Sequence, residues 1–107
     1  MTRELHVVMT SLETADQAAE LARTLLAERL AVCVQIGDPV RSFYRWQGAL
    51  ADTPEVPLLL KVRHDRLARC LDRLAELHPY DTPEILAWPV PLAAARYLDW
   101  AYSEDDA

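Results

Sequence analysis

The residues best suited to chemistry are concentrated in one stretch, residues 78–85, with the sequence His-Pro-Tyr-Asp-Thr-Pro-Glu-Ile. The stretch offers an imidazole, a phenol and two carboxylates, and its two prolines fix their own φ and favour extended conformations in the residues before them. A stiff polar connector of this kind suits a binding site, with His78, Tyr80 and Glu84 as candidate contact residues. The alternative is that the prolines only shape a turn, with Tyr80 packed and Glu84 in solvent.

The composition is that of an ordinary globular domain. The chain has 107 residues, of which 51% are hydrophobic and 26% are charged, so we expect residues 1–107 to form one domain whose core needs no disulfides. The formal net charge is −6, whereas a nucleic-acid binder needs a basic surface that displaces counterions from phosphates. We therefore expect no nucleic-acid partner.

The sequence also predicts a compartment. No apolar run approaches the roughly 20 residues that a membrane-spanning helix needs, so no membrane partner is expected. The first ten residues lack the basic start and apolar run of a signal peptide. Cys33 and Cys70 are far apart and form no CxxC pair. Together these features predict a cytoplasmic protein with free thiols, and Cys70 falls in the apolar stripe of a helix, where a core thiol is expected.

The apolar pattern predicts the elements that must position the connector. Short β-branched runs and alternating stretches predict strands at 5–10, 31–36, 40–47, 56–62 and 85–90, with a turn region at 48–54. Apolar residues at helical spacing predict three helices. The first begins at Thr14, where Thr14 and Gln17 have capping-box spacing. The second spans 65–77 with Asp65 as its expected cap, and the third spans 92–102 and is followed by a frayed tail at 103–107. The order β-α-β-β-α-β with a C-terminal helix predicts an α+β, ferredoxin-like fold: a four-stranded antiparallel sheet with two helices on one face.

Residues 37–39 break the strand pattern without clearly ending it, so residues 31–47 count as one strand, which forms a hairpin with the return strand 56–62. This hairpin is too long for the rest of the domain. Continuous strand from residue 31 to residue 47 would exceed the usual length of about 17–20 Å, and its distal half carries Phe43, Tyr44 and Trp46. An aromatic arm with an open strand edge favours pairing with another chain. We therefore expect a homo-oligomer held by this arm; the alternative is that the arm folds back over its own sheet.

Lys61 interrupts an apolar strand. By alternation its ammonium group either faces solvent or is buried beside a carboxylate, since lysines are almost never fully buried unless they are paired. Glu84 in the connector is a possible partner for it.

Several motifs, taken together, resemble the CutA family of divalent-cation tolerance proteins. They are Ala-Val-Cys-Val at 31–34, Ser-Phe-Tyr-Arg-Trp-Gln-Gly at 42–48, Glu55, Lys61, His-Pro-Tyr at 78–80, Pro-Glu-Ile at 83–85 and Tyr-Leu-Asp-Trp at 97–100. The resemblance implies a ferredoxin-like subunit in a homotrimer similar to the PII signalling proteins, with long hairpins that pair across subunits. It also implies a role in divalent metal-ion tolerance and no established catalytic activity.

Copper binding has been attributed to some members of this family. Where ligands have been assigned, Cys and His stand at the positions that this chain fills with Met9 and Leu77, so only His78 of that set is present. Leu77 cannot bind a metal, but Met9 offers a thioether sulfur to Cu(I). The metal candidates are therefore His78, with Met9 or Cys33 as a soft sulfur ligand.

Three hypotheses about function follow. The first is a non-enzymatic trimer in metal-ion tolerance, with copper or another divalent cation as its candidate ligand and no other cofactor. The second is a PII-like sensor of small ligands, and the third is a purely structural scaffold. In the sensor the clefts between subunits would be lined by Cys33, Tyr44, Trp46, Lys61, His78, Tyr80 and Glu84. The chain has only two glycines and no glycine-rich phosphate loop, which argues against nucleotide binding.

Overall fold

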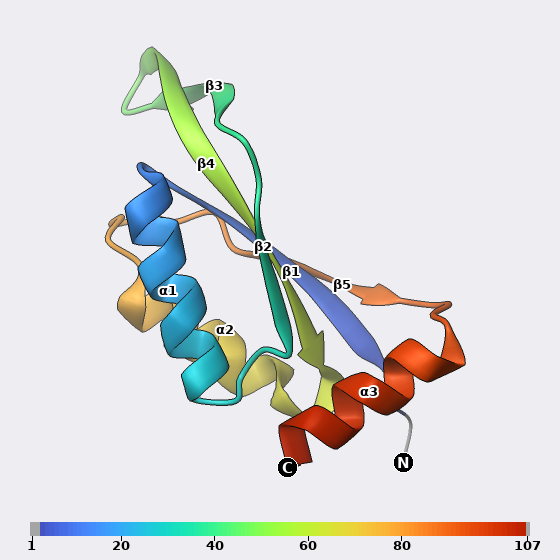
Figure 1. The fold of residues 1–107 in the computed structure, drawn as a ribbon. Helices are drawn as coiled ribbons and strands as arrows, with labels where there is room; N and C mark the ends of the chain where they lie inside the picture. Colours follow the sequence, from blue (N-terminus) through green and yellow to red (C-terminus); the bar gives the residue numbers. More distant parts are fainter. Residues whose placement is uncertain (1–2, 107) are drawn as a thin grey trace.

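The structure is a computed structural model that describes residues 3–106, and it is an α+β fold built on one antiparallel sheet (Figure 1). In chain order the elements are β1 (Leu5–Leu12), α1 (Ala15–Ala27), β2 (Cys33–Ile36), β3 (Val40–Trp46), β4 (Ala49–Arg63), a 3₁₀ turn η1 (His64–Arg66), α2 (Leu67–Leu77), β5 (Leu86–Val90) and α3 (Ala95–Asp106). Among residues 3–106, no helix is both long enough and apolar enough to span a membrane.

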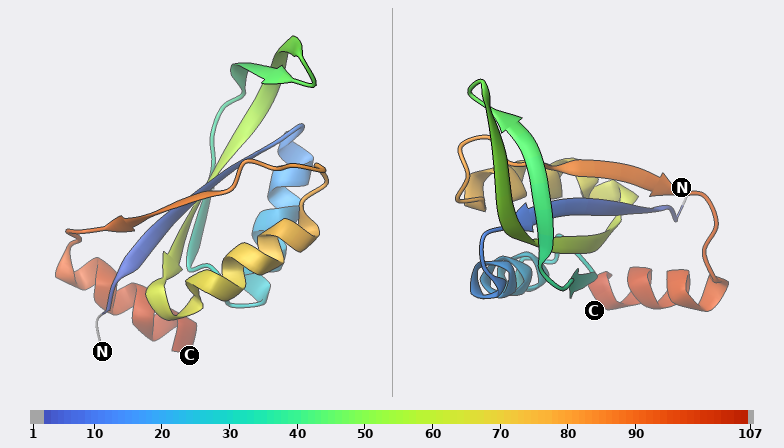
Figure 2. Two further views of the ribbon diagram at one scale, coloured as in Figure 1. Left: turned by 180° about the vertical axis from the view of Figure 1, so that it is seen from behind. Right: turned by 90° about the horizontal axis from the view of Figure 1, so that it is seen from above.

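The sheet has the strand order β2-β4-β1-β5, and β3 pairs with the first half of β4. Alternate residues of β4 explain its two faces: Val56, Leu58, Leu60 and Val62 are buried, because they pack with α1 and α2. Helix α3 packs on the opposite face, where Leu5 of β1 meets the end of the helix. The helices therefore cover one face fully and the other only at one end (Figures 1 and 2).

Most of the elements expected from the sequence are present. The capping box of α1 is confirmed: the Thr14 hydroxyl accepts from the Gln17 backbone N–H, and the Gln17 side chain accepts from the Thr14 N–H. Asp65, expected as a helix cap, instead pairs with Arg63 at 2.7 Å. A 3₁₀ turn therefore precedes α2, whose N-terminus has no side-chain cap.

The turn predicted at residues 48–54 is wrong in extent. The chain reverses in only two residues, Gln47 and Gly48, which place Trp46 opposite Ala49. Their φ values of 50° and 80° are both positive, as a two-residue type I′ hairpin turn requires. Residues 49–55 therefore continue as strand, and β4 reaches 15 residues.

The C-terminal helix differs from its prediction at both ends. It begins at Ala95 instead of residue 92, and residues 103–106, predicted as a frayed tail, belong to its last turn; Ala107 lies outside the described residues. A buried contact fixes this end: Arg63, 5% exposed, lies with its guanidinium 4.4 Å from the centre of the Tyr102 ring. The Tyr102 hydroxyl also donates to the Glu4 carbonyl at 2.6 Å.

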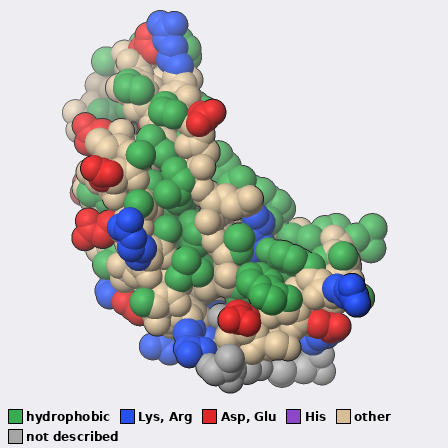
Figure 3. Space-filling view, in the orientation of Figure 1, with side chains coloured by type: hydrophobic (Ala, Val, Ile, Leu, Met, Phe, Trp, Pro, Cys, Tyr) green, Lys and Arg blue, Asp and Glu red, His purple; other side chains and the backbone are tan. Residues whose placement is uncertain are grey.

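The hairpin of β3 and the distal half of β4, residues 40–55, is here called the arm. It projects beyond the helices (Figure 1), and the longest dimension of the molecule is 46 Å. Its apolar side chains are largely uncovered: Phe43 is 58% exposed and Leu50 is 74% exposed. Figure 3 shows apolar side chains running from the arm onto the sheet face that α3 leaves open.

The turn of the arm gives a first prediction. Gly48→Ala should lower the free energy of unfolding by about 1 kcal/mol, because a Cβ is strained in the left-handed region. Gln47→Asn should instead raise it by a few tenths of a kcal/mol, because Asn tolerates positive φ better than Gln. Urea denaturation at a fixed protein concentration measures both, and the same sign for the two variants would contradict a type I′ turn.

Candidate functional site

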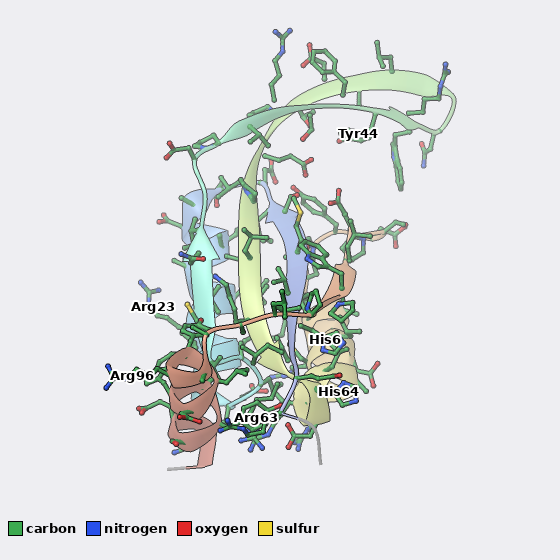
Figure 4. The ribbon with its side chains drawn as sticks, turned by 90° about the vertical axis from the view of Figure 1, so that its right-hand side faces the viewer. His6, Arg23, Tyr44, Arg63, His64 and Arg96 are labelled. Atoms are coloured by element: carbon green, nitrogen blue, oxygen red, sulfur yellow. The ribbon has the colours of Figure 1, made fainter. Side chains whose placement is uncertain are left out.

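The structure contains a cleft of about 570 Å³ between the arm and the connector of residues 78–84. Figure 4 shows the arm curving over the end of the sheet above this region, with Tyr44 on the arm. The lining residues come from four segments that are distant in sequence, and they are Ser11, Ser42, Phe43, Tyr44, Trp46, Glu55, Tyr80, Asp81, Thr82 and Glu84. Of the predicted site residues, the cleft brings together Tyr44, Trp46, Tyr80 and Glu84.

Strand alternation positions the wall formed by the arm. Ser42, Tyr44 and Trp46 are two residues apart in β3, so their side chains share one face of the hairpin. The cross-strand neighbour of Ser42 is Thr53, whose hydroxyl donates to the Tyr44 hydroxyl at 3.4 Å. Glu55 pairs opposite Val40 at the base of the arm, which places its carboxylate at the floor of the cleft.

The opposite wall depends on how the connector is held. Strand β5 pairs with β1 only as far as Met9, so the last residues of β1 have a free edge that the connector can occupy. His78 makes this contact: its Nε2 lies 3.0 Å from the Ser11 carbonyl and 3.0 Å from the Thr10 hydroxyl. Its Nδ1 accepts from the Tyr80 backbone N–H at 3.2 Å. The imidazole thus joins the connector to β1.

These contacts define the protonation state of His78. A ring nitrogen that accepts from a backbone N–H carries no proton, so the proton of the neutral ring is on Nε2 and is donated to the Ser11 carbonyl. Burial lowers the pKa of His78, while the Ser11 carbonyl and the charge of Glu55 oppose that shift. His78 is therefore a neutral structural residue whose two nitrogens are both engaged.

Tyr80 turns from this anchor toward the cleft. Its ring meets the His78 ring edge-on, with 4.7 Å between centroids, and its hydroxyl donates to Glu55 Oε2 at 3.3 Å. Burial, together with the negative charge of Glu55, raises the pKa of Tyr80 to about 12. The phenol therefore stays protonated near neutral pH and acts as a hydrogen-bond donor.

Cys33 and Lys61 lie outside this cleft within one subunit. They are cross-strand neighbours in β2 and β4, and the Lys61 ammonium donates to the Gln35 side-chain oxygen. Burial, together with the neighbouring Cys33 thiol, raises the pKa of the Tyr97 phenol in α3. A place for Cys33 and Lys61 in a cleft between subunits stays a prediction.

The predicted metal ligands do not fit a common site in one subunit. Met9 and Thr10 are adjacent in β1 and point to opposite faces, and His78 contacts the side chain of Thr10. Met9 and His78 therefore cannot bind the same ion. Across residues 3–106, no three His, Cys, Asp or Glu side chains are grouped closely enough to hold a metal ion.

Two features were missed from the sequence. Glu55 was noted only as part of a motif, yet it forms the floor of the cleft; no local signal could find it, because its partner Tyr80 is 25 residues away. The second feature is a pair of imidazoles, His6 and His64, which stack with 5.2 Å between centroids (Figure 4). Nδ1 of His6 is buried and has no hydrogen-bond partner in the structure.

Comparison with known families identifies the relatives of this fold. The sequence model of a family described as CutA1 divalent ion tolerance protein matches residues 6–104. The chain belongs to the CutA1 family. This confirms the resemblance seen in the motifs of the arm and the connector.

Individual CutA proteins resemble the chain over most of its length. The divalent-cation tolerance protein CutA of Thermus thermophilus is 38% identical over 94 residues, which are 88% of this chain and 91% of that protein. The structure of CutA from Synechococcus elongatus has a TM-score of 0.90 at 34% identity and covers 95% of this chain and 90% of that one. The protein named periplasmic divalent cation tolerance protein CutA of Archaeoglobus fulgidus has a TM-score of 0.89 at 29% identity, over 94% and 98% of the two chains.

The buried imidazole predicts a loss of stability in acid. Because the pKa of His78 is lower in the folded state than its ordinary value of 6.5, the unfolded chain binds more protons just below that pH. The free energy of unfolding should therefore fall as the pH drops through about 6.5 and level off below the folded-state pKa. Urea denaturation between pH 7.5 and pH 5 measures this fall.

The matched variants for this test are His78→Gln and His64→Gln. His78→Gln should be less stable at pH 7.5, because the contacts to Ser11 and Tyr80 are lost, but it should also show a smaller fall in acid. His64 lies in the 3₁₀ turn, away from the contacts of His78, so His64→Gln should retain the part of the fall that His78→Gln loses. An equal acid dependence in the wild type and His78→Gln would contradict the assignment of a buried neutral imidazole.

Proposed function

We propose that this chain is a non-enzymatic, ferredoxin-like subunit of a homotrimer that acts in divalent-cation tolerance. Membership of the CutA1 family supports the tolerance role. The strand order β2-β4-β1-β5 with α1 and α2 on one face supports the ferredoxin-like description. The resemblance to the CutA family supports an assembly of three subunits and its similarity to the PII proteins.

The observation that carries the assembly is the uncovered arm. Strand β1 pairs with residues 56–63 of β4, so in residues 49–55 the edge of β4 that faces away from β3 has no partner strand within residues 3–106. Exposed strand edges and exposed aromatic side chains are together unfavourable in an isolated subunit. Neighbouring subunits would cover both, as well as the open face of the sheet that holds Lys61.

A divalent cation, copper included, does not fit His78 of a single subunit, because both ring nitrogens are already engaged. We infer that a cation bound by this protein takes ligands from more than one subunit. The tolerance role would then depend on assembly, because a separated subunit would lack part of the ligand set.

A second candidate function is a PII-like sensor of small ligands. The cleft favours it, since about 570 Å³ lies within the usual range of 300–1,000 Å³ for ligand sites. A purely structural trimer is the alternative if neither a cation nor a small ligand binds. The free thiols of Cys33 and Cys70 support a cytoplasmic location.

The oligomeric state tests the assembly. Light scattering after size exclusion should give three times the subunit mass of 12.1 kDa. Leu50→Glu, which places a charge on the exposed arm, should shift the protein toward smaller species on dilution. Arg69→Glu, on an exposed position of α2, is the matched control and should remain a trimer. A wild-type monomer at all concentrations would overturn the proposal.

Titration calorimetry tests the cation. We expect Cu(II), or Cu(I) under reducing conditions, to bind wild type and His78→Gln with the same affinity within a factor of about two. Binding should weaken in Leu50→Glu at concentrations where that variant dissociates. Loss of stoichiometric binding in a trimeric His78→Gln variant would contradict the inference that His78 is not a ligand.

A further inference from the structure

The sheet face that α3 leaves open carries few charges. By strand alternation this face holds the odd-numbered residues of β1 and β4 and their cross-strand neighbours, opposite the core residues Leu58 and Leu60. Within the strands of residues 3–106, the charged side chains on this face are Glu55, Lys61 and Arg63. Arg63 is buried against α3. Glu55 and Lys61 are therefore the charges that a subunit covering this face would meet.

Lys61 lacks a charged partner in its own subunit. It is the only lysine in the chain, it is half-buried, and its ammonium group donates to a neutral acceptor, the Gln35 side-chain oxygen. Lysines are almost never fully buried unless they are paired. If a neighbouring subunit covers the open face, the ammonium group therefore needs a carboxylate from that neighbour.

The cleft under the arm has the complementary property. Three carboxylates line it, from Glu55, Asp81 and Glu84, and none of the described lining residues is a lysine or an arginine. Glu55 Oε2 accepts from the Tyr80 hydroxyl, which is a neutral donor. Covering these carboxylates without adding a cation would be unfavourable, because water that solvates their charge would be displaced.

Glu55 and Lys61 cannot meet within one subunit. They are six residues apart on β4, and a rise of about 3.3 Å per residue separates their Cα atoms by about 20 Å. In a closed ring of subunits, however, one patch of each subunit contacts a different patch of the next. We propose that Lys61 of each subunit enters the cleft of a neighbouring subunit and forms an ion pair with Glu55 there. This inference rests on the proposed homotrimer.

The surroundings of Glu55 suit an incoming ammonium group. The rings of Tyr44, Trp46 and Tyr80 line the cleft, and the face of an aromatic ring attracts a cation within about 6 Å. The Tyr80 hydroxyl holds one carboxylate oxygen of Glu55. Because its phenol stays protonated near neutral pH, Tyr80 adds no negative charge of its own. Exclusion of water by the covering subunit would strengthen the ion pair.

Glu55 fits this role better than the other two carboxylates. Asp81 and Glu84 are exposed on the connector, where water can continue to solvate them. Glu55 is half-buried on the strand face itself, so a subunit that packs on this face removes more of its water. The predicted contact therefore lies at the floor of the cleft and fixes which parts of two neighbouring subunits face each other.

Cross-linking with a carbodiimide tests the contact directly. The reagent activates a carboxylate, which forms an amide with an amine that touches it, while the carboxylate oxygen leaves with the reagent as a urea. We expect covalent dimers and trimers of the wild type on a denaturing gel. Trypsin cleaves after Arg45 and Arg63, so the product should be copies of segment 46–63 joined from Lys61 of one to Glu55 of another.

The matched control for cross-linking is Lys61→Arg, which keeps the positive charge but has no reactive amine. It should remain a trimer and lose the joined segments. A wild-type trimer in which Lys61 is joined to another carboxylate, to Glu55 of its own chain, or to none would overturn the inference. This test does not depend on the folding of any variant with a reversed charge.

Charge reversal tests the energetics by light scattering along a dilution series, in urea if the wild type does not otherwise dissociate. Lys61→Glu and Glu55→Lys should each raise the protein concentration of half-dissociation at least about tenfold, because like charges then face each other. The double variant should return to within about threefold of the wild type. Since the two positions are too far apart within a chain, such recovery requires contact between subunits.

A second double variant, Lys61→Glu with Glu84→Lys, is the control for the choice of carboxylate and should not recover. Recovery with Glu84→Lys instead of Glu55→Lys would overturn the assignment to Glu55. A wild-type monomer at all concentrations would overturn the proposed assembly and the inference together. A wild-type trimer whose Lys61→Glu and Glu55→Lys double variant is as weak as the weaker single variant would overturn the inference alone.

Discussion

Strand β4 is about twice as long as the part of it that pairs with β1. This difference in length produces both the arm and the cleft beneath it. Residues 56–63 of β4 lie beside β1 and alternate between the helical core and the open face of the sheet. Residues 49–55 pair only with β3, so the hairpin leaves the sheet as an arm. The arm both overhangs the connector and presents uncovered apolar side chains.

The cleft arises where this arm meets a second constraint, the anchoring of His78. Because β5 stops at the level of Met9, the end of β1 is free to accept the connector through the Ser11 carbonyl. The imidazole that looked most like a metal ligand is thus used inside the protein. The anchor presents to the cleft the residues that follow it, which are Tyr80, Asp81, Thr82 and Glu84.

Local patterns were enough to predict the elements and the place of the connector. Apolar alternation located the strands, and the Thr14–Gln17 capping box located the start of α1 correctly. The turn predicted at 48–54 is wrong for a local reason. Asp52, Thr53 and Pro54 are residues that favour turns, but the positive φ values of Gln47 and Gly48 complete the chain reversal before them. Asp65 had the right spacing for a cap but is engaged by Arg63, whose buried guanidinium needs a carboxylate.

The features that the sequence could not supply depend on register. Met9 and His78 lie on different faces of the sheet because the connector contacts the side chain of Thr10, the neighbour of Met9 in β1. Glu55 lines the cleft beside Tyr80 because the connector crosses the end of the sheet near it. Neither is encoded in the spacing of nearby residues. Similarly, strand alternation predicts that Lys61 faces solvent or a carboxylate, whereas its hydrogen-bond partner in the structure is the Gln35 side-chain oxygen.

The bare edges of the arm also have a consequence for biosynthesis. If the chain assembles as proposed, a newly made subunit that has folded but not yet met its neighbours exposes strand edges that can pair with a strand of another nascent chain. The time spent in this unassembled state depends on how much of the protein is present, so aggregation competes most strongly with correct assembly when synthesis is rapid and partners are still incomplete. In the proposed trimer the same edges would make subunit exchange slow, because a departing subunit would have to give up all of these strand contacts together.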